Sequence, residues 1–426
     1  MRAYARHTTV SRTFPHVYGT VTYFPYIAFI MRVAVVTESF LPTLNGVTNS
    51  VKKVLDHLRL RGHEAIVICP KAGAPSEYAG FPVHEVATVN LREFPVGLPC
   101  PQVERVLREF RPDILHAASP AMLGWHALIA AKRQRIPSVA IFQTDVAGYT
   151  RSNKLGIMRD FAWKVIRAIH TQADLTLAPS THSIRDLERQ RIPRVQRWGR
   201  GVDLTSYHPQ HRHCPESAAL RASIAAEDEV IVGYVGRLAP EKQVERLREL
   251  QGIPGAKFVV VGDGPSRGSV ERAMRNMPVT FLGKRSGRDL SLAYSIFDVF
   301  VHTGTEETFG QTLQEAHAAG LPVIAPLAGG PIDLVTHGYD GYLFDPTTHR
   351  GNDSMRQYVA RLVGDESLRA RMGEAGRRRV LDRSWERVCD DLLDYYDQTI
   401  LTSFAPTDGA ASTGRMLVTP SEHISR

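Results

Sequence analysis

The sequence predicts an α/β protein with two doubly wound parallel sheets. Short apolar runs bounded by turn residues alternate with segments of helical periodicity, which is typical of parallel strands buried between helices. The alternation occurs on both sides of an irregular stretch at 202–228. A chain of 426 residues has room for two or three domains of about 150 residues each. These observations exclude a single small binding module.

The predicted strands are short and rich in valine, isoleucine and leucine. In the first half they are Arg32–Thr37, Ala65–Cys69, Ile114–Ala117, Ser138–Gln143 and Leu175–Ala178. In the second half they are Glu229–Val235, Lys257–Val261, Val279–Leu282, Val299–His302 and Leu321–Ala325. Helices are expected between them, and the first is marked by Val51, Val54, Leu55 and Leu58 at helical spacing before Gly62.

The same pattern predicts the domain organisation. We expect a disordered N-terminal extension at 1–30, a first domain at 31–204, a linker at 205–228 and a second domain at 229–380. Ser384 is expected to cap a final helix at 381–400, and the tail at 401–426 has the composition of a disordered segment. The arginines and apolar run of 1–30 resemble a secretory leader, but Pro25 and the lack of an Ala-x-Ala site favour an extension.

Composition narrows the range of partners. The chain carries 52 Lys and Arg against 44 Asp and Glu, a formal net charge of +8, which permits an anionic partner such as a phosphate ester or an acidic membrane. Cys69, Cys100, Cys214 and Cys389 lie far apart, so neither a disulfide framework nor a thiolate zinc site is predicted, and a reducing cytoplasm suits them. No apolar run reaches the ~18 residues that a transmembrane helix needs.

The strongest motif places Glu307 and Glu315 on either side of a predicted helix start. Glu307 follows a predicted strand, and Gly310 opens a helix over 311–319, whose N-terminus presents free amides and a positive dipole to a phosphate. Carboxylates on both sides suit the sugar and ribose hydroxyls that flank a pyrophosphate. The alternative is a glutamate at a helix N-terminus with a solvated neighbour.

Other polar motifs also follow predicted strands. Arg237 and Lys242, in Gly236–Lys242, have the charge needed to neutralise a diphosphate, although a solvated loop would look the same. In the first half, Gly46 permits close backbone approach, but the absence of Gly-x-Gly-x-x-Gly argues against a dinucleotide-binding dehydrogenase. Further strand ends supply His116, Thr144 with Asp145, and Arg200 to Asp203, for which buried, satisfied polar groups are the alternative.

Two motifs point to other chemistry and are weaker. Gly264 to Gly268 fits Gly-x-Ser-x-Gly around Ser266, the nucleophile elbow of a hydrolase, but Gly262 to Gly264 has already ended the strand. Four side chains resemble zinc ligands, but they lie in a polar linker that favours solvated residues: His208, His211, His213 and Cys214.

The motifs together resemble those of the retaining GT-B glycosyltransferases of the family 4 type, over Met31 to about Thr399. The resemblance lies in the combination of Asn45 to Val47, Gly236 to Lys242, and Glu307 with Glu315. The sequences at 38–42, 116–120, 143–145 and 200–203 are most similar to those of actinobacterial GDP-mannose-dependent α-mannosyltransferases that act on lipid acceptors. Plant and cyanobacterial sulfoquinovosyl-diacylglycerol synthases share many of the same residues.

The resemblance implies a GT-B fold, in which two Rossmann-like domains face a cleft and the C-terminal helix crosses back to the first domain. The second domain would hold the nucleotide-sugar donor and the first the acceptor. The resemblance assigns catalytic roles to Arg237, Lys242 and Glu307, with Asp145 or His116 at the reacting end. The implied donor-binding residues are Gly46, Arg237, Lys242, Gly262, Gly264, Lys284, Glu307, Thr308, Phe309, Gly310, Gln311 and Glu315, and the acceptor-side residues are Asn45, Thr144, Tyr149 and Arg200. One departure is Ala118, where related phosphatidylinositol mannosyltransferases carry a second histidine.

The predicted function is transfer of an α-hexose, mannose from GDP-mannose, with retention to a hydroxyl of a glycolipid or lipid-linked acceptor. No metal or other cofactor is expected, because Arg237, Lys242 and a helix dipole can stabilise the leaving diphosphate. A UDP-linked glucose or sulfoquinovose donor, a sugar-nucleotide epimerase and a non-catalytic nucleotide-binding protein remain alternatives. Nucleic acid is not an expected partner. Basic residues of the first domain predict a peripheral enzyme on the anionic cytoplasmic face of the plasma membrane: Lys52, Lys53, Arg59, Arg61, Lys132, Arg133, Arg135, Arg151, Lys154, Arg159, Lys164 and Arg167.

Overall fold

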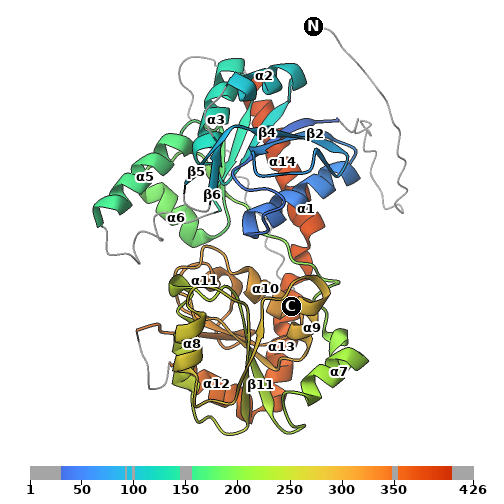
Figure 1. Cartoon of the computed structure of the whole chain (residues 1–426), viewed down its shortest axis with the longest axis vertical. Helices are drawn as coiled ribbons and strands as arrows, with labels where there is room; N and C mark the ends of the chain where they lie inside the picture. Colours follow the sequence, from blue (N-terminus) through green and yellow to red (C-terminus); the bar gives the residue numbers. More distant parts are fainter. Residues whose placement is uncertain (1–29, 92–93, 98–100, 144–155, 348–353, 405–426) are drawn as a thin grey trace, which may run out of the picture.

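The computed structural model describes residues 30–91, 94–97, 101–143, 156–347 and 354–404. They form two lobes, each built on a largely parallel sheet with helices on both faces (Figure 1). Of the segments predicted to be disordered, 1–29 and 405–426 lie outside the described residues, whereas 401–404 continue the last helix, so the prediction is wrong for those four residues. The α/β class expected from the alternating pattern is confirmed.

The first lobe contains an eight-stranded sheet in the order β10-β9-β8-β7-β1-β2-β4-β3. All its pairs are parallel except the antiparallel pair β3 and β4. The strands are β1 Arg32–Thr37, β2 Glu64–Pro70, β3 Glu77–Tyr78, β4 Phe81–Val86, β7 Ile114–Ala118, β8 Ser138–Ile141, β9 Leu175–Ala178 and β10 Val195–Arg197. The helices are α1 Gly46–Leu60, α2 Pro101–Phe110, α3 Met122–Gln134, α5 Gly156–His170 and α6 Thr181–Arg189, and a separate hairpin pairs β5 Thr88–Leu91 with β6 Phe94–Gly97.

The second lobe contains a six-stranded parallel sheet in the order β13-β12-β11-β14-β15-β16. Its strands are β11 Val230–Val235, β12 Ala256–Val261, β13 Val279–Gly283, β14 Val299–Val301, β15 Val323–Pro326 and β16 Gly341–Phe344. Its helices are α7 Pro215–Ala222, α8 Arg267–Ala273, α9 Gly287–Ser295, α10 Gln311–Ala318, α11 Pro331–Leu334, α12 Met355–Gly364 and α13 Glu366–Val380. Short 3-10 helices are η1 Pro209–His213, η2 Pro240–Lys242, η3 Val244–Leu250 and η4 Leu381–Arg383.

The central strands of both sheets are buried on both faces, as their apolar sequences predict. Along β1, Val33 and Val35 pack into the core that contains α1, whereas Ala34 and Val36 pack into the core that contains α2 and α3. All six residues of β11 are buried. Strand order reverses between β1 and β7 in the first sheet and between β11 and β14 in the second. In open α/β sheets, ligands bind beyond the carboxyl ends of the strands at such switch points.

The last helix, α14 Trp385–Phe404, crosses back to the first lobe, as expected (Figure 1). Its buried face, with Val388, Leu392 and Tyr396, belongs to the same core as α1. The Trp198 indole donates a hydrogen bond to the Val388 carbonyl at 2.8 Å. The two chain crossings between the lobes meet where the amide of Val202 donates to the Arg383 carbonyl at 2.9 Å.

The expectation of an irregular stretch at 202–228 is wrong in part. This stretch contains α7, which is anchored to the second lobe by a buried carboxylate. Arg212 and Arg221 each donate to Asp298 at 2.8 Å, and the Asp298 side chain also accepts the Ile231 amide at 2.8 Å. The helix is only eight residues long, so its apolar periodicity is too short to stand out in the sequence.

Candidate active site

The carboxyl ends of β11 and β14 bring Lys242 and Glu307 together. Lys242 lies in η2, after β11, and its Nζ is 2.6 Å from Oε2 of Glu307, which lies in the loop after β14. Two further hydrogen bonds join the same loops. The Thr303 hydroxyl donates to the Lys242 carbonyl at 2.7 Å, and the Gln243 amide donates to the Thr305 hydroxyl at 2.9 Å. The position of Lys242 relative to Glu307 is therefore held by backbone as well as by side chains.

The environment of Glu307 keeps its carboxylate ionised. Burial favours the neutral acid, but the charges of Lys242 and His302 and hydrogen bonds from Lys242 and the Phe309 amide lower the pKa of Glu307 to about 2. His302 Nε2 lies 3.9 Å from Glu307 Oε2. Burial lowers the pKa of His302 to about 4, so this imidazole is neutral near pH 7. Lys242 is thus the main cation facing Glu307.

The loop that leads into α10 depends on three glycines. Gly310, the N-cap of α10, has φ +103°, a conformation that favours glycine. A Cβ on Gly329 would lie 2.5 Å from the Glu307 carbonyl oxygen, and one on Gly330 would lie 2.4 Å from that of Phe309. The Gly330 amide donates to the Glu307 carbonyl at 2.7 Å. This packing fixes the α10 N-terminus, where the first-turn amides have no acceptor within the helix.

Glu315 lies one turn inside α10 and has a different environment. The Tyr294 hydroxyl donates to its carboxylate at 2.9 Å. Burial raises the pKa of Glu315 to about 7, although hydrogen bonds from Tyr294 and Gln311 oppose the shift. Gln311 also donates to the Gly201 carbonyl at 3.0 Å, which ties α10 to the segment between the lobes.

Arg237 follows β11, on the same side of the sheet as Lys242, and forms an ion pair with Glu241. Two glycines predicted to bind the donor make a tight contact with this loop. A Cβ on Gly262 would lie 1.9 Å from the Gly236 carbonyl oxygen, and one on Gly264 would lie 2.4 Å from that of Leu238. The close packing of the loop after β12 against the loop after β11 is therefore sufficient to explain why both positions are glycine. Lys284, also predicted to bind the donor, is exposed after β13.

The first lobe brings the start of α1 to the opposite wall of the cleft. Asn45 is the N-cap of α1, and its side-chain oxygen accepts the Val47 and Thr48 amides at 2.9 and 3.0 Å. Gly46 is the first helical residue, and a Cβ there would meet Nη1 of Arg200 at 2.9 Å. The structure thus gives Asn45 a capping role and places Arg200 against Gly46.

His116 lies in the core rather than at the cleft. Its side chain is 1% exposed, and Nδ1 forms a hydrogen bond with the Tyr396 hydroxyl of α14. Burial lowers the pKa of His116 to about 3. A neutral imidazole enclosed between β7 and α14 has no access to substrate, so the expected catalytic role of His116 is replaced by a packing role. Three other predicted residues lie outside the described residues: Thr144, Asp145 and Tyr149.

A small cavity of about 30 Å³ between the lobes contains residues that the sequence reasoning missed. His182 Nδ1 and Asp186 Oδ2, on the first turns of α6, are 3.2 Å apart. They face the loop of Glu307 across the cavity, which is lined by Phe142, His182, Ser183, Asp186, Thr305, Glu306, Glu307, Thr308 and Gly329. No motif marked α6, because a His and an Asp at i and i+4 are common on solvated helices.

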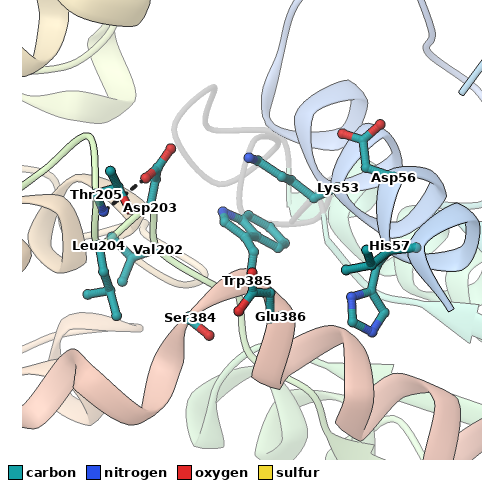
Figure 2. Close-up of a pocket in the computed structure, with 11 residues that line it drawn as sticks. Lys53, Asp56, His57, Val202, Asp203, Leu204, Thr205, Ser384, Trp385 and Glu386 are labelled. Carbon is teal, nitrogen blue, oxygen red and sulfur yellow. Dashed lines mark hydrogen bonds between the residues drawn. The ribbon is translucent and has the colours of Figure 1, made fainter. Parts of the chain in front are cut away.

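Two larger cavities lie nearer the hinge, the place where the two chain crossings between the lobes meet at Val202 and Arg383. One of about 360 Å³ contains Gly46, Arg200, Gln311 and Glu315, and so connects the predicted donor residues of both lobes. The other, of about 390 Å³, lies between α1, the 202–205 segment and the start of α14. Figure 2 shows Lys53 and Trp385 among the side chains that line it. It contains neither Lys242 nor Glu307, so the hinge cavity is separate from the predicted reacting centre.

Two features are absent from the described part of the chain. No group of three or more His, Cys, Asp or Glu side chains is arranged there to hold a metal ion. No helix among those residues is both long and apolar enough to cross a bilayer.

Comparison with known proteins decides the family. Residues 217–379 match the family described as "Glycosyl transferases group 1", and residues 44–206 match "Glycosyltransferase Family 4". A GDP-mannose-dependent alpha-mannosyltransferase of Mycolicibacterium smegmatis is 46% identical over 378 residues, which are 87% of this chain and 98% of that protein. The chain belongs to the family 4 glycosyltransferases. The family expected from the sequence motifs is thereby confirmed.

Other similar proteins agree with this assignment. A GDP-mannose-dependent alpha-mannosyltransferase of Mycobacterium tuberculosis is 46% identical over 86% of this chain and 96% of its own length. Sulfoquinovosyl transferase SQD2 of Arabidopsis thaliana is 31% identical over 83% of this chain and 71% of its own length. The glycosyltransferase fold matches the crystal structure of Anabaena HepE in complex with UDP, with a TM-score of 0.70, 20% identity and coverage of 86% of this chain and all of HepE. The GT-B fold is confirmed.

Proposed function

We propose that this glycosyltransferase moves an α-mannosyl group from GDP-mannose, with retention, to a hydroxyl of a lipid-linked acceptor. The Lys242–Glu307 pair beside the α10 N-terminus carries the proposal, because it places a cation, a carboxylate and free amides at one switch point. The choice of GDP-mannose follows the activity for which the relatives that are 46% identical are named.

Each group has a role in the proposed reaction. Lys242, Arg237 and the backbone amides of Phe309, Gly310 and Gln311 bind the diphosphate, whose negative charge grows as the bond to the anomeric carbon breaks. The acceptor oxygen bonds to that carbon on the same face, and its proton passes to the leaving phosphate. These cations and amides perform the charge neutralisation that a metal would otherwise supply. Activity is therefore expected to persist in EDTA.

The carboxylates are proposed to hold the two ends of the donor. Glu307, ionised at neutral pH, accepts hydrogen bonds from the transferred sugar, and Thr308 lies beside it. Glu315 holds the ribose hydroxyls, and Gly46 lets the first lobe approach the phosphates closely. Gly262, Gly264 and Lys284 are proposed to lie near the base. On the acceptor side, Asp145, with Thr144 and Tyr149, stays a prediction.

We propose that the enzyme reaches its lipid acceptor while it is bound to the anionic cytoplasmic face of the plasma membrane. In the first lobe, Leu60 of α1 and Phe161 of α5 are 71% and 68% exposed. Arg59 precedes Leu60, and Lys164 and Arg167 follow Phe161. Apolar side chains beside basic ones suit a peripheral contact with acidic headgroups. The full chain is expected to sediment with anionic vesicles at low salt and not with neutral ones, and equal binding to both would contradict this part.

Donor selectivity tests the proposed function. The protein is incubated with radiolabelled GDP-mannose, UDP-glucose or UDP-sulfoquinovose together with membrane lipid. We expect label from GDP-mannose in the lipid phase, from which an α-mannosidase releases labelled mannose. Transfer from a UDP-sugar would favour the second candidate, a sulfoquinovosyl or glucosyl transferase, which the 31% identity to SQD2 supports. Nucleotide binding with neither transfer nor donor hydrolysis would indicate a non-catalytic protein.

A further inference from the structure

Arg200 projects its guanidinium from the segment between the lobes into the cleft. Nη2 donates to Oε1 of Gln143, at the end of β8, at 2.8 Å. Nη1 lies against Gly46, where a Cβ would meet it at 2.9 Å. The guanidinium is therefore fixed in front of the first residue of α1 by one amide and one glycine.

The guanidinium of Arg200 forms no ion pair within the described part of the chain. Among the described residues, no carboxylate lies within ion-pair distance of this guanidinium, whose one hydrogen-bond partner is the neutral amide of Gln143. Burial lowers the pKa of Arg200, with Glu307 opposing the shift from a distance. Partly buried arginines normally pair with an anion, because desolvating an unpaired charge is costly. Counting only the residues that the structure describes, the site thus has a positive charge without a matching negative one.

Gln143 supplies a second donor without an acceptor. Its side chain is 7% exposed, and no described residue accepts a hydrogen bond from its Nε2. Buried amide groups are nearly always paired. An orphan donor beside an unpaired guanidinium indicates a ligand that offers several acceptor oxygens.

The backbone of Arg200 faces the other half of the predicted phosphate site. Gln314, in the first turns of α10, donates to the Arg200 carbonyl at 2.8 Å. A Cβ on Gly199 would lie 3.7 Å from the Phe309 ring. Arg200 therefore lies between the N-termini of α1 and α10, in the cavity of about 360 Å³ that also contains Glu315. Two helix N-termini and a guanidinium around one space favour phosphate.

We infer that Arg200, supported by Gln143, binds a phosphate of the nucleoside diphosphate and supplies a cation on the first-lobe side of the donor site. This differs from the acceptor-side role that the sequence resemblance implied, and it rests on the proposed donor being a nucleoside diphosphate. Lys242 and Arg200 then bind the diphosphate from opposite lobes. The diphosphate would join the two lobes, so donor binding would favour a closed cleft.

Equilibrium binding of GDP to the full chain, without acceptor, tests this inference. Gln143→Glu places a carboxylate beside Arg200, which neutralises the guanidinium without removing it. We expect GDP to bind this variant at least about tenfold more weakly, the effect of losing one charge-assisted hydrogen bond. The melting temperature is expected to stay within about 2 °C of the wild type, since a paired buried charge is near neutral for stability. Arg200→Lys, which keeps the charge but not the fork, is expected to weaken GDP binding as well.

The control is Arg108→Ala, which removes one positive charge from the exposed surface of α2 and is expected to leave GDP affinity unchanged. Wild-type affinity for GDP in both Gln143→Glu and Arg200→Lys would overturn the inference. A raised KM for the acceptor with an unchanged affinity for GDP would also overturn the inference, because the phosphate that Arg200 binds would then belong to the acceptor. If the wild type bound neither GDP nor UDP, the proposed function itself would fall, an outcome separable from a failure of the variants alone.

Discussion

Lys242 Nζ lies 2.6 Å from Glu307 Oε2, and this ion pair joins the loops that follow β11 and β14. Because the two strands are neighbours at the switch point of the sheet, the pair occupies the position where α/β proteins bind ligands. Lys242 serves two partners in the proposed complex: it keeps Glu307 ionised and neutralises the diphosphate.

Replacing Lys242 by alanine is expected to reduce turnover at least about a hundredfold, because a positioned cation is lost from the developing charge of the leaving group. The same change removes the charge that lowers the pKa of Glu307, so burial then dominates and the pKa rises. A new loss of activity toward acidic pH should therefore accompany the lower rate. Transfer rates with GDP-mannose, measured across pH, report both effects.

Lys242→Arg is the companion variant, since it keeps the charge and changes the geometry. It is expected to retain the wild-type pH profile while losing part of the rate. Near-normal turnover in Lys242→Ala would contradict the role of this residue.

Glu315→Gln is expected to change stability in a pH-dependent way. Burial raises the pKa of Glu315 to about 7, above the ordinary value of about 4.3. Between these values the folded protein holds a proton that the unfolded chain has released, so stability falls as pH rises through this window. Glutamine cannot ionise, so we expect the variant to melt about 2–4 °C higher than the wild type at pH 8 and to show a clearly smaller gain at pH 5, near the lower end of the window. An equal rise in melting temperature at both pH values would show that the ionisation of Glu315 is not the cause.

Tyr396→Phe tests whether His116 acts in packing or in catalysis. The variant leaves a buried imidazole without the hydroxyl partner from α14, which is expected to cost about 1–3 kcal/mol of unfolding free energy. Urea denaturation measures this loss. The rate of transfer under folding conditions should not change, because neither residue reaches the cleft. A large fall in kcat with unchanged stability would restore a catalytic role.

The convergence of Lys242 and Glu307 could be predicted because each residue follows a strand. Parallel strands place their carboxyl ends at one edge, so a motif after one strand lies near a motif after the next. The core strands could be predicted for a related reason: β7 and β11 are buried on both faces, so their sequences are continuous apolar runs. By contrast, β4 is missing from the predicted strands because it contains Pro82 and His84. A strand near the edge of a sheet needs fewer apolar side chains than a central strand does.

The pairings that the sequence could not show join distant segments. His116 and Tyr396 are 280 positions apart, and the strand-end location that suggested catalysis for His116 does not reveal which face its side chain takes. The direction of the Arg200 side chain depends on Gln143 and Gly46, which become neighbours only when the first lobe has folded. The His182–Asp186 pair faces Glu307 only because the two lobes meet there.

Gly46→Ala separates the stability of α1 from the geometry of the proposed phosphate site, which includes Gly46 itself and the guanidinium of Arg200. An ordinary φ at this first helical position accepts alanine, whose helix propensity is about 1 kcal/mol better than that of glycine. The new methyl would lie 2.9 Å from Nη1 of Arg200, so the guanidinium must move away from its place beside Gln143. We expect unchanged or slightly higher thermal stability together with GDP binding about threefold or more weaker, the scale of one strained charge-assisted hydrogen bond. Gly364→Ala is the matched control, because its Cβ would enter open space, and it should leave GDP binding unchanged. A Gly46→Ala variant with wild-type GDP affinity would show that the Arg200 position does not matter for the donor.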